Sequence, residues 1–315
     1  MTVLVTGATG FLGRHLVSLL LSRGESVRAL VRPGQQADDV HRLGAEVVRG
    51  NILDRVAMCG AARGCGLVFH LAGVVAHEDR DLPRLAAVNV EGTRVLLEAA
   101  GQEARIVHVS SVAAIGPAPA ADRLADERQP FPSWANRLPY AATKRAGEEL
   151  ALGAAECGAD VVVANPGFLL GPGDVHRIST WAIGRYLQGA LRFHAPGGLS
   201  FVDVRDVAAG LIAAAQRGRA GERYILTSRE GNLSHQELFR RVAAVTGVRR
   251  RMLPLPSRLV ILATSLIPWP VKPGEARAAV HWWFYDPAKA EVELGFRTRP
   301  LDETLAATAA QYIGT

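Results

Sequence analysis

The stretch that decides the fold stands at the start of the chain, where residues 2–13 read TVLVTGATGFLG. A short apolar run is followed by a turn with glycine at every third position, and leucines then recur at helical spacing. This pattern predicts a strand, a tight turn and a helix. The Gly-x-x-Gly-x-x-Gly spacing differs from the common Gly-x-Gly-x-x-Gly fingerprint, but the setting is the one that brings a pyrophosphate to a helix N-terminus. We therefore predict a dinucleotide site here, in preference to a purely structural turn.

The same alternation continues through the first half of the chain. It predicts strands at residues 26–31, 45–49, 67–70, 105–109 and 161–164, and helices at 82–100 and 139–157. The strands are apolar without strict alternation, as expected when helices cover both faces of a parallel sheet. The predicted fold class is therefore α/β, a doubly wound parallel sheet of the Rossmann type.

From residue 166 onward the pattern loosens, and proline, glycine and tryptophan become frequent. This change predicts a smaller, discontinuous C-terminal substrate lobe. We expect a dinucleotide-binding Rossmann domain at residues 1–165, with 201–228 returning to it as a strand and a helix. The substrate lobe is expected from residues 166–200 and 229–300.

Composition excludes several classes of protein. With 315 residues, 49% apolar and 21% charged, the chain is expected to fold as a soluble protein. The formal charge is +6, but the arginines are scattered, and the run Arg249–Arg251 is typical of a solvated helix-to-strand corner, so no nucleic-acid partner is predicted. The apolar stretch 259–271 contains two prolines and is shorter than the roughly 20 residues of a membrane span. It predicts a buried or substrate-facing helix.

Cysteine usage and the N-terminus bear on the compartment. The three cysteines have no metal-ligand spacing and cannot all pair, which favours a reducing environment and predicts no metal site. The chain starts directly on a strand-like run without the features of a signal peptide. The expected localisation is cytoplasmic.

The end of the second predicted strand bears on the choice of cofactor. NAD sites commonly place an acidic residue there, to bind the adenosine ribose. Here the segment ends in Arg32, whose guanidinium can pair with a 2′-phosphate. An arginine in place of the acidic residue favours NADP over NAD. The alternative is that Arg32 is an ordinary solvated side chain.

Tyr140 and Lys144 stand four residues apart on a predicted helix and so share one face. Only three of the 36 basic residues are lysine, which makes a chance occurrence of this pair unexpected. A close ammonium group stabilises phenolate and lowers the pKa of the tyrosine from about 10. A phenol tuned in this way can exchange a proton with a carbonyl or an alcohol near neutral pH.

Two more polar sites follow apolar strands. Ser110 and Ser111 come after the strand at 105–109, at the end where doubly wound sheets bind their ligands. A serine hydroxyl there can bind a substrate oxygen, or it can cap a turn. His70 and His108 lie within apolar strands and are expected to be core histidines with satisfied hydrogen bonds.

In these motifs the chain resembles the extended short-chain dehydrogenase/reductase (NAD-dependent epimerase/dehydratase) family, in its dihydroflavonol-4-reductase-like branch. The resemblance covers nearly the whole chain. Besides the glycine turn, the two serines and the Tyr/Lys pair, it rests on GNILD at 50–54, HLAG at 70–73, NVEGT at 89–93, NPG at 165–167, GPGD at 171–174, FVDVRDV at 201–207 and ELGF at 293–296. The branch is indicated by VRALVRP at 27–33 and by GPGD.

The resemblance implies a role for individual residues. Tyr140 would be the general acid/base, and Lys144 would hold the nicotinamide ribose and depress the pKa of the tyrosine. Ser111 would polarise the substrate oxygen, in preference to Ser110, because the family serine lies five residues before a glycine, here Gly116. Asn51 stands where the family more often has aspartate against the adenine. The cofactor-binding residues implied are Gly7, Gly10, Phe11, Leu12, Gly13, Arg32, Asn51, Ile52, Leu71, Ala72, Gly73, Lys144, Pro166 and Gly167.

Three functions are compatible with these residues. The leading one is an NADPH-dependent reductase of a ketone or aldehyde on a fairly apolar small molecule, with Tyr140 as general acid. Seven aromatic residues either line its pocket or form the core of the lobe: Trp181, Phe193, Phe201, Trp269, Trp282, Trp283 and Phe284.

The alternative is an NAD-dependent nucleotide-sugar epimerase or dehydratase, whose substrate diphosphate would need cations such as Arg177, Arg185, Arg192 or Arg258. A non-catalytic cofactor-sensing protein is disfavoured by the intact Ser111, Tyr140 and Lys144. By analogy with the family, a homodimer could form through the helix at 139–157.

Overall fold

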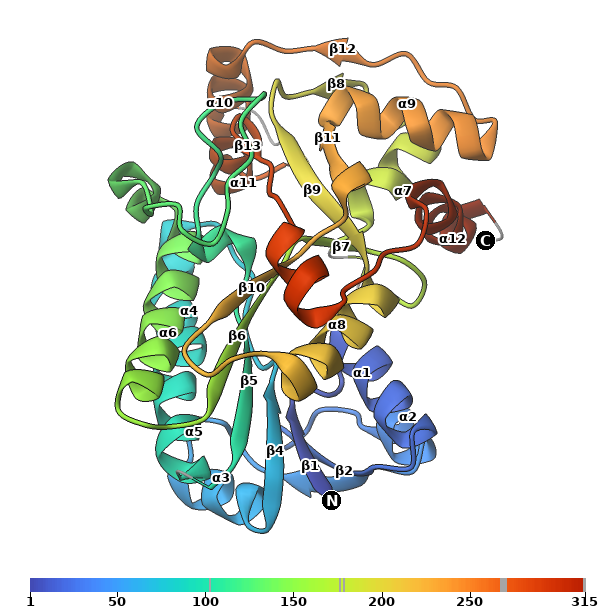
Figure 1. Cartoon of the computed structure of the whole chain (residues 1–315). Coiled ribbons are helices and arrows are strands. Elements are labelled where there is room, and N and C mark those ends of the chain that lie inside the picture. Colours follow the sequence, from blue (N-terminus) through green and yellow to red (C-terminus); the bar gives the residue numbers. More distant parts are fainter. Residues whose placement is uncertain (102, 176, 178, 267–270, 314–315) are drawn as a thin grey trace.

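A seven-stranded parallel sheet forms the larger part of the computed structural model, which describes residues 1–101, 103–175, 177, 179–266 and 271–313 (Figure 1). The strand order is β10-β6-β5-β4-β1-β2-β3, and each neighbouring pair is parallel. This order confirms the doubly wound α/β fold. The strands are β1 (Thr2–Thr6), β2 (Ser26–Val31), β3 (Glu46–Arg49), β4 (Cys65–His70), β5 (Arg105–Val109), β6 (Val161–Pro166) and β10 (Arg223–Leu226).

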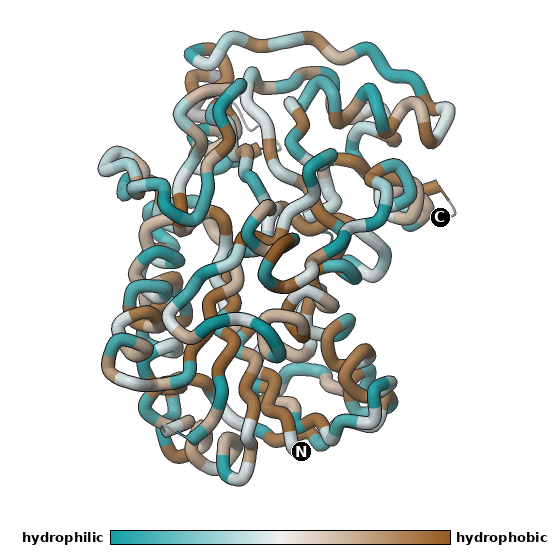
Figure 2. Tube along the Cα trace, viewed as in Figure 1, coloured by the Kyte–Doolittle hydropathy of each residue, from teal (hydrophilic) through white to brown (hydrophobic). Residues whose placement is uncertain are grey.

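Helices cover both faces of this sheet. Successive side chains of each strand point in turn to one helix layer and then to the other. Val3 and Val5 of β1 pack into one hydrophobic cluster, whereas Leu4 between them packs into the other. Figure 2 shows these strands as the most hydrophobic part of the chain. Because both faces are covered, the strands need no polar side, which explains the continuous apolar runs in the sequence. One layer holds α1 (Phe11–Ser22), α2 (Asp38–Arg42) and α8 (Val204–Arg217), and the other holds α3 (Arg55–Ala62), α5 (Gly92–Ala100) and α6 (Pro139–Glu156).

The helix predicted at 82–100 is divided in the structure. It consists of α4 (Leu82–Leu85), a π-helical segment (Ala86–Glu91) and α5. A second π-helical segment spans Ala290–Leu294, and short 3-10 turns span Asp79–Asp81, Val112–Ala114, Ser133–Arg137 and Arg229–Gly231.

A second region is built on a small mixed sheet. In it β9 (Gly198–Asp203) pairs with β7 (Phe168–Leu170), β11 (Asn232–Ser234) and β13 (Trp282–Trp283), and β8 (Phe193–His194) pairs separately with β12 (Leu253–Pro254). Its helices are α7 (Trp181–Leu187), α9 (His235–Thr246), α10 (Ser257–Leu266), α11 (Pro273–Ala279) and α12 (Leu301–Ile313). Within the predicted return segment 201–228, α8 and β10 lie with the large sheet, whereas β9 belongs to the small one. The domain limits themselves stay a prediction.

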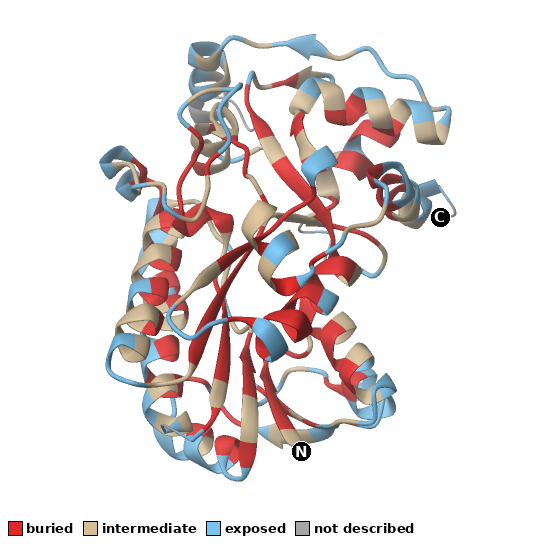
Figure 3. Ribbon diagram, viewed as in Figure 1, coloured by how far each residue is buried: buried red, intermediate tan, exposed pale blue. Residues whose placement is uncertain are grey.

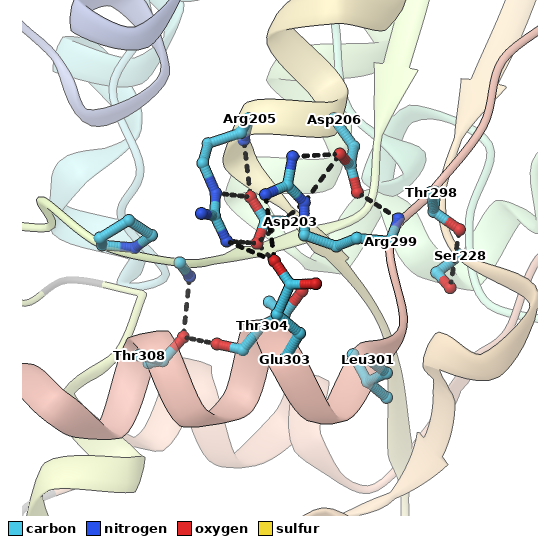
Figure 4. A network of polar contacts seen from close by, with 12 residues as sticks. Asp203, Arg205, Asp206, Ser228, Thr298, Arg299, Leu301, Glu303, Thr304 and Thr308 are labelled. Carbon is cyan, nitrogen blue, oxygen red and sulfur yellow. Dashed lines mark hydrogen bonds and ion pairs between the residues drawn. The ribbon is translucent and has the colours of Figure 1, made fainter.

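A polar network joins α12 to the start of α8 (Figure 4). The buried carboxylate of Asp203 caps α8 by accepting from the Arg205 backbone N–H at 2.8 Å, and it also accepts from the Thr304 hydroxyl on α12 at 2.9 Å. Arg299 forms an ion pair with Asp206 in the first turn of α8. The charged residues of the FVDVRDV motif therefore serve to attach the C-terminal helix.

The outer end of the lobe tests two sequence predictions. Arg249, Arg250 and Arg251 are exposed between the end of α9 and the start of β12, which confirms the solvated corner. The described part of the stretch 259–271 lies in helix α10, but the prediction that it is buried is wrong, because Leu259 is 49% and Leu262 52% exposed. The alternative that this helix faces a substrate stays a prediction. Of that stretch, residues 267–270, Trp269 among them, lie outside the described residues.

Across the residues that the structure describes, no helix combines the length and the apolar character needed to cross a bilayer.

Candidate active site

The strands that carry the predicted site residues end side by side at one edge of the large sheet. Thr6 at the end of β1 pairs in register with His70 at the end of β4, which pairs in turn with His108 of β5. The strand order reverses between β1 and β4, and doubly wound sheets bind their ligands in the crevice beyond such a switch point. The edge brings together the glycine turn, the serines and the first turns of α6.

Lys144 lies on the buried face of α6, one turn after Tyr140. Its Nζ donates to the Val109 carbonyl oxygen at 2.9 Å, and a methyl group placed on Gly73 would lie 3.9 Å from it. Burial lowers the pKa of Lys144 to about 8, although the Glu148 carboxylate opposes the shift. The ammonium group is thus held at the crevice, between the ends of β4 and β5.

The environment of Tyr140 is dominated by apolar packing, and not by the nearby positive charge that the sequence led us to expect. Burial raises the pKa of its phenol above 10, and a hydrogen bond with the Ser111 side chain acts in the opposite direction. The predicted lowering of the pKa by Lys144 is therefore wrong for this structure, because desolvation of the phenolate outweighs the stabilising contacts. The ring lies 5.8 Å from that of His77 and packs against a cluster that includes Trp283.

The two serines differ in their surroundings. Ser111 begins a short 3-10 turn, where its Oγ accepts from the Ala113 N–H at 3.1 Å, and its side chain reaches Tyr140. The Ser110 side chain is buried, and its Oγ has no hydrogen-bond partner among the described residues. In this one position Ser111 can both cap the turn and bind a substrate oxygen, the two roles that the sequence left open.

A buried polar chain behind the site escaped the sequence analysis. The Asn165 Nδ2 donates to the Ser111 carbonyl oxygen at 2.9 Å and to a Glu148 carboxylate oxygen at 2.5 Å. The Arg223 guanidinium on β10 donates to the other Glu148 oxygen at 2.9 Å. Glu148 could have been found from the sequence, because it follows Tyr140 and Lys144 at the same four-residue spacing.

Asn89 is a second positioning residue that was missed. It lies in the π-helical segment, where its side chain exchanges hydrogen bonds with both backbone groups of Val74 at 2.8 and 3.1 Å and donates to Thr143 Oγ1 at 3.2 Å. Asn89 thereby joins the loop after β4 to α6 at Thr143, next to Lys144. A π-helical turn at such a place is a recurrent feature of functional sites, and the NVEGT motif was its only sign in the sequence.

The glycine turn has the shape that a dinucleotide requires. Gly7 has φ +71°, and a methyl group there would lie 2.8 Å from the Ala72 backbone nitrogen. A side chain on Gly13 would clash with the Gly7 carbonyl oxygen. No described side chain caps α1, whereas Asp54 caps α3 by accepting from two backbone N–H groups. The free N–H groups of α1 suit a pyrophosphate, so these residues fit the cofactor.

Arg32 lies at the end of β2, next to this turn. Its Nε donates to Gln35 Oε1 at 3.2 Å, and Gln35 in turn donates to Thr9 Oγ1 in the glycine turn at 2.7 Å. Arg49 holds the same loop by donating to the Gln35 carbonyl oxygen at 2.5 Å. The guanidinium of Arg32 is exposed, which leaves it able to meet an anionic group of a bound ligand.

The other predicted cofactor residues lie at the ends of β3, β4 and β6, on the same edge of the sheet. Leu71 and Ala72 are fixed by hydrogen bonds from their backbone N–H groups to Thr6, both at 3.2 Å. The Asn51 side chain is exposed and accepts from the Leu53 N–H at 3.1 Å, whereas Ile52 is buried against Gly92. Pro166 and Gly167 follow at the end of β6, where the Gly167 N–H donates to the Leu226 carbonyl at 3.1 Å.

Comparison with known proteins agrees with this geometry. Residues 3–226 match the family model described as the NAD dependent epimerase/dehydratase family. The chain belongs to the NAD-dependent epimerase/dehydratase family. This confirms the resemblance seen in the sequence, and it makes the chain an NAD(P)-dependent oxidoreductase.

Relatives within the family carry different names. A putative dihydroflavonol 4-reductase from Synechocystis is 35% identical over 324 residues, covering 96% of this chain and 92% of that protein. Sterol demethylase protein B from Methylococcus capsulatus is 34% identical over 266 residues, covering 82% and 79%. The crystal structure of a nucleoside-diphosphate-sugar epimerase from Pseudomonas aeruginosa superposes with a TM-score of 0.83 at 26% identity, covering 100% and 97%.

Two histidines lie beneath the site of this epimerase/dehydratase family member, with ring centroids 5.5 Å apart. His70 hydrogen-bonds with Thr6 Oγ1 at 2.8 Å and Thr93 Oγ1 at 3.3 Å, which confirms it as a satisfied core residue. The same prediction is wrong for His108, because neither of its ring nitrogens has a partner among the described residues. Burial lowers the pKa of both rings, that of His70 to about 3.

The aromatic residues of the lobe divide between core and surface. Phe201, Trp283 and Phe284 are buried in hydrophobic clusters, so they form core, whereas Trp181, Phe193 and Trp282 are partly exposed. The arginines suggested for a substrate diphosphate, Arg177, Arg185, Arg192 and Arg258, are all exposed.

Proposed function

We propose that the chain is an NADPH-dependent reductase of a ketone or aldehyde on a fairly apolar small molecule. The observation that carries this proposal is the position of Arg32, held through Gln35 beside the glycine turn, where an NAD-specific site would have a carboxylate. The apolar cluster against which Tyr140 packs supports an apolar substrate. The reductase and sterol demethylase names of two relatives point in the same direction.

Tyr140 and Ser111 would act on the carbonyl oxygen. Bound NADPH supplies a hydride to the carbonyl carbon. The phenol of Tyr140 is protonated at neutral pH, as a tyrosine without a lowered pKa is, and it would donate its proton to the oxygen as negative charge develops there. Ser111, next to the phenol, would orient the same oxygen by hydrogen bonding.

Lys144 and the glycine turn would hold the cofactor. The Lys144 ammonium is fixed at the crevice by Val109 and would donate to the nicotinamide ribose. The uncapped N-terminus of α1 would bind the pyrophosphate, and Arg32 the 2′-phosphate. Pro166 and Gly167 would border the nicotinamide.

An NAD-dependent nucleotide-sugar epimerase or dehydratase is the second candidate, favoured by the solved epimerase of similar structure. It would use the same tyrosine and lysine but retain one NAD through oxidation and re-reduction. A homodimer through α6 and a cytoplasmic location also remain proposals, and sedimentation equilibrium tests the first of them.

Dissociation constants for NADPH and NADH separate the two functions. If Arg32 binds the 2′-phosphate, Arg32→Ala weakens NADPH by about 1.5–3 kcal/mol, the usual contribution of a charge-assisted hydrogen bond, and leaves NADH unchanged. Arg42→Ala, which removes an exposed arginine of α2, is the matched control and changes neither constant. Equal losses for both cofactors, or tighter binding of NADH by the wild type, would favour the epimerase. All constants are measured at one ionic strength, because exposed charges are screened.

A further inference from the structure

The outer end of the lobe exposes apolar side chains that no described part of the chain covers. Leu259 and Leu262 lie three residues apart on α10, so they share one face of the helix, and they are 49% and 52% exposed. Leu253 on the preceding strand β12 is 42% exposed. Figure 3 shows β12 and much of α10 as exposed, at the end of the molecule farthest from the N-terminus. We call this surface the α10 face, defined by Leu253, Leu259 and Leu262.

The stretch of chain that carries the α10 face, from α9 to the start of α11, is strongly basic. Residues 238–274 contain no aspartate or glutamate but seven basic residues, so the rest of the chain is close to neutral although the whole carries +6. Arg249, Arg251 and Arg258 are exposed, and none of them forms an ion pair with a described residue. The basic residues are Arg240, Arg241, Arg249, Arg250, Arg251, Arg258 and Lys272.

The α10 face is connected to the substrate side of the site. Helix α11 follows it along the chain, and the Gly274 N–H at the start of α11 donates to a Glu78 carboxylate oxygen at 2.9 Å. His77, next to Glu78, contacts the ring of Tyr140. The segment that follows the α10 face is therefore attached to the loop that packs on the ring of the proposed general acid.

We propose that the α10 face docks the protein on the surface of an anionic lipid bilayer. Exposed leucines can enter the boundary between headgroups and acyl chains, while Arg258 on α10 and the exposed arginines before β12 attract anionic headgroups. With ten residues α10 is too short to cross the membrane, so the association is peripheral. A second copy of the chain is a poorer occupant, because a two-fold interface would bring the two basic stretches together.

Vesicle sedimentation tests the proposal without an assay of activity. The full-length protein is mixed with vesicles of phosphatidylcholine alone or of phosphatidylcholine with phosphatidylglycerol. We expect binding to the anionic vesicles at low salt, its loss at high salt, and little binding to the neutral vesicles. Equal binding to both kinds of vesicle, or to neither, would overturn the proposal.

Two sets of variants locate the contact. Replacing Arg249, Arg250 and Arg251 together by glutamine should lower the affinity for anionic vesicles about a hundredfold, since each surface cation contributes roughly a fivefold factor. Leu259→Gln with Leu262→Gln should lower it at least about tenfold. The matched control replaces Arg23, Arg42 and Arg63, three exposed arginines of the large-sheet half, by glutamine and should leave the affinity within about threefold.

The remaining outcomes are also decisive. NADPH binding, measured on every variant, shows whether the cofactor site is intact. A failure of the lipid proposal can therefore be told apart from a failure of the reductase proposal. An equal loss of vesicle affinity in the control would reduce the effect to net charge and overturn the assignment to the α10 face. A dimer of the wild type that becomes a monomer in the leucine variant would make a second copy the occupant and overturn the lipid proposal.

Discussion

The carboxyl edge of the large sheet and the outer end of the lobe differ in burial: charged groups are buried at the first, whereas apolar side chains are exposed at the second. At the sheet edge, the charged groups of Lys144 and Glu148 are buried, and each has a hydrogen-bonded partner from another part of the chain. At the outer end of the lobe, the leucines of the α10 face are exposed, and Arg249, Arg251 and Arg258 of the same stretch form no ion pair with the described residues. The burial colours of Figure 3 show the same contrast.

The contrast separates positions that hold the fold from positions that face a ligand or a surface. A buried charge is strongly destabilising once its partner is lost, so the sheet edge has little freedom to change. An exposed leucine contributes little to the folded state, so it can be retained for contact with something outside the chain. Substitutions should therefore have large effects at the first region and small effects on stability at the second.

The largest effect is expected for Glu148→Ala. Removing the carboxylate leaves the Arg223 guanidinium without its partner in the ion pair, and Asn165 loses a hydrogen-bond acceptor. The free energy of unfolding should fall by about 3–5 kcal/mol. Glu149→Ala on the exposed face of α6 is the matched control, and the loss of its pair with Arg145 should change stability by about 0.5 kcal/mol or less. Urea denaturation measures both. Equal effects would remove the contrast between buried and exposed charge.

Tyr140→Phe should lower turnover at least about a hundredfold, equivalent to roughly 2.7 kcal/mol in the barrier, because the general acid is lost. Stability and the dissociation constant for NADPH should stay close to those of the wild type. Steady-state rates at controlled pH, with a ketone or aldehyde substrate, provide the measurement. A variant with near-native turnover would show that Tyr140 is not the proton donor.

His108→Leu should stabilise the protein, and more at acid pH than at neutral pH. The buried ring stays neutral in the folded protein, whereas in the unfolded chain it takes up a proton below about pH 6.5. Stability is therefore lost as the pH falls, and removing the ring should improve unfolding free energy by about 2 kcal/mol more at pH 5 than at pH 7.

The pH difference does not depend on how well leucine packs, since packing contributes equally at both pH values. His70→Leu is the comparison variant. It should be less stable than the wild type at pH 7, because it lacks the hydrogen bonds to Thr6 and Thr93. A gain for His108→Leu that is the same at pH 5 and pH 7 would mean that the folded protein protonates this ring.

The smallest effect is expected for Leu262→Gln on α10. The side chain is 52% exposed and glutamine is a good helix former, so the free energy of unfolding should change by no more than about 0.5 kcal/mol. Thermal and urea denaturation give the value. A loss above about 1.5 kcal/mol would show that the leucine is covered in the folded protein, and the contrast with the sheet edge would fail.

Several elements of the site could be read from local patterns. The glycine turn, the Tyr/Lys spacing and the alternation of strands and helices each depend on residues close together in sequence, and the structure places them at one sheet edge. The pKa of Tyr140 could not be read in this way, because its shift comes from burial among residues such as Trp283, which is 143 positions away in sequence. The partners of Glu148 were likewise hidden, since Arg223 comes from another strand.

By itself the sequence determined the doubly wound fold, the position of the dinucleotide turn and the face of α6 that carries Tyr140 and Lys144, because backbone geometry imposes short periods that the residues repeat. Only the tertiary structure decided that Asn165 and Arg223 complete the bonding of Glu148, that His108 lacks the partners His70 has, and that the leucines of α10 face outward. These outcomes depend on which distant segments pack together, and no local period encodes that choice.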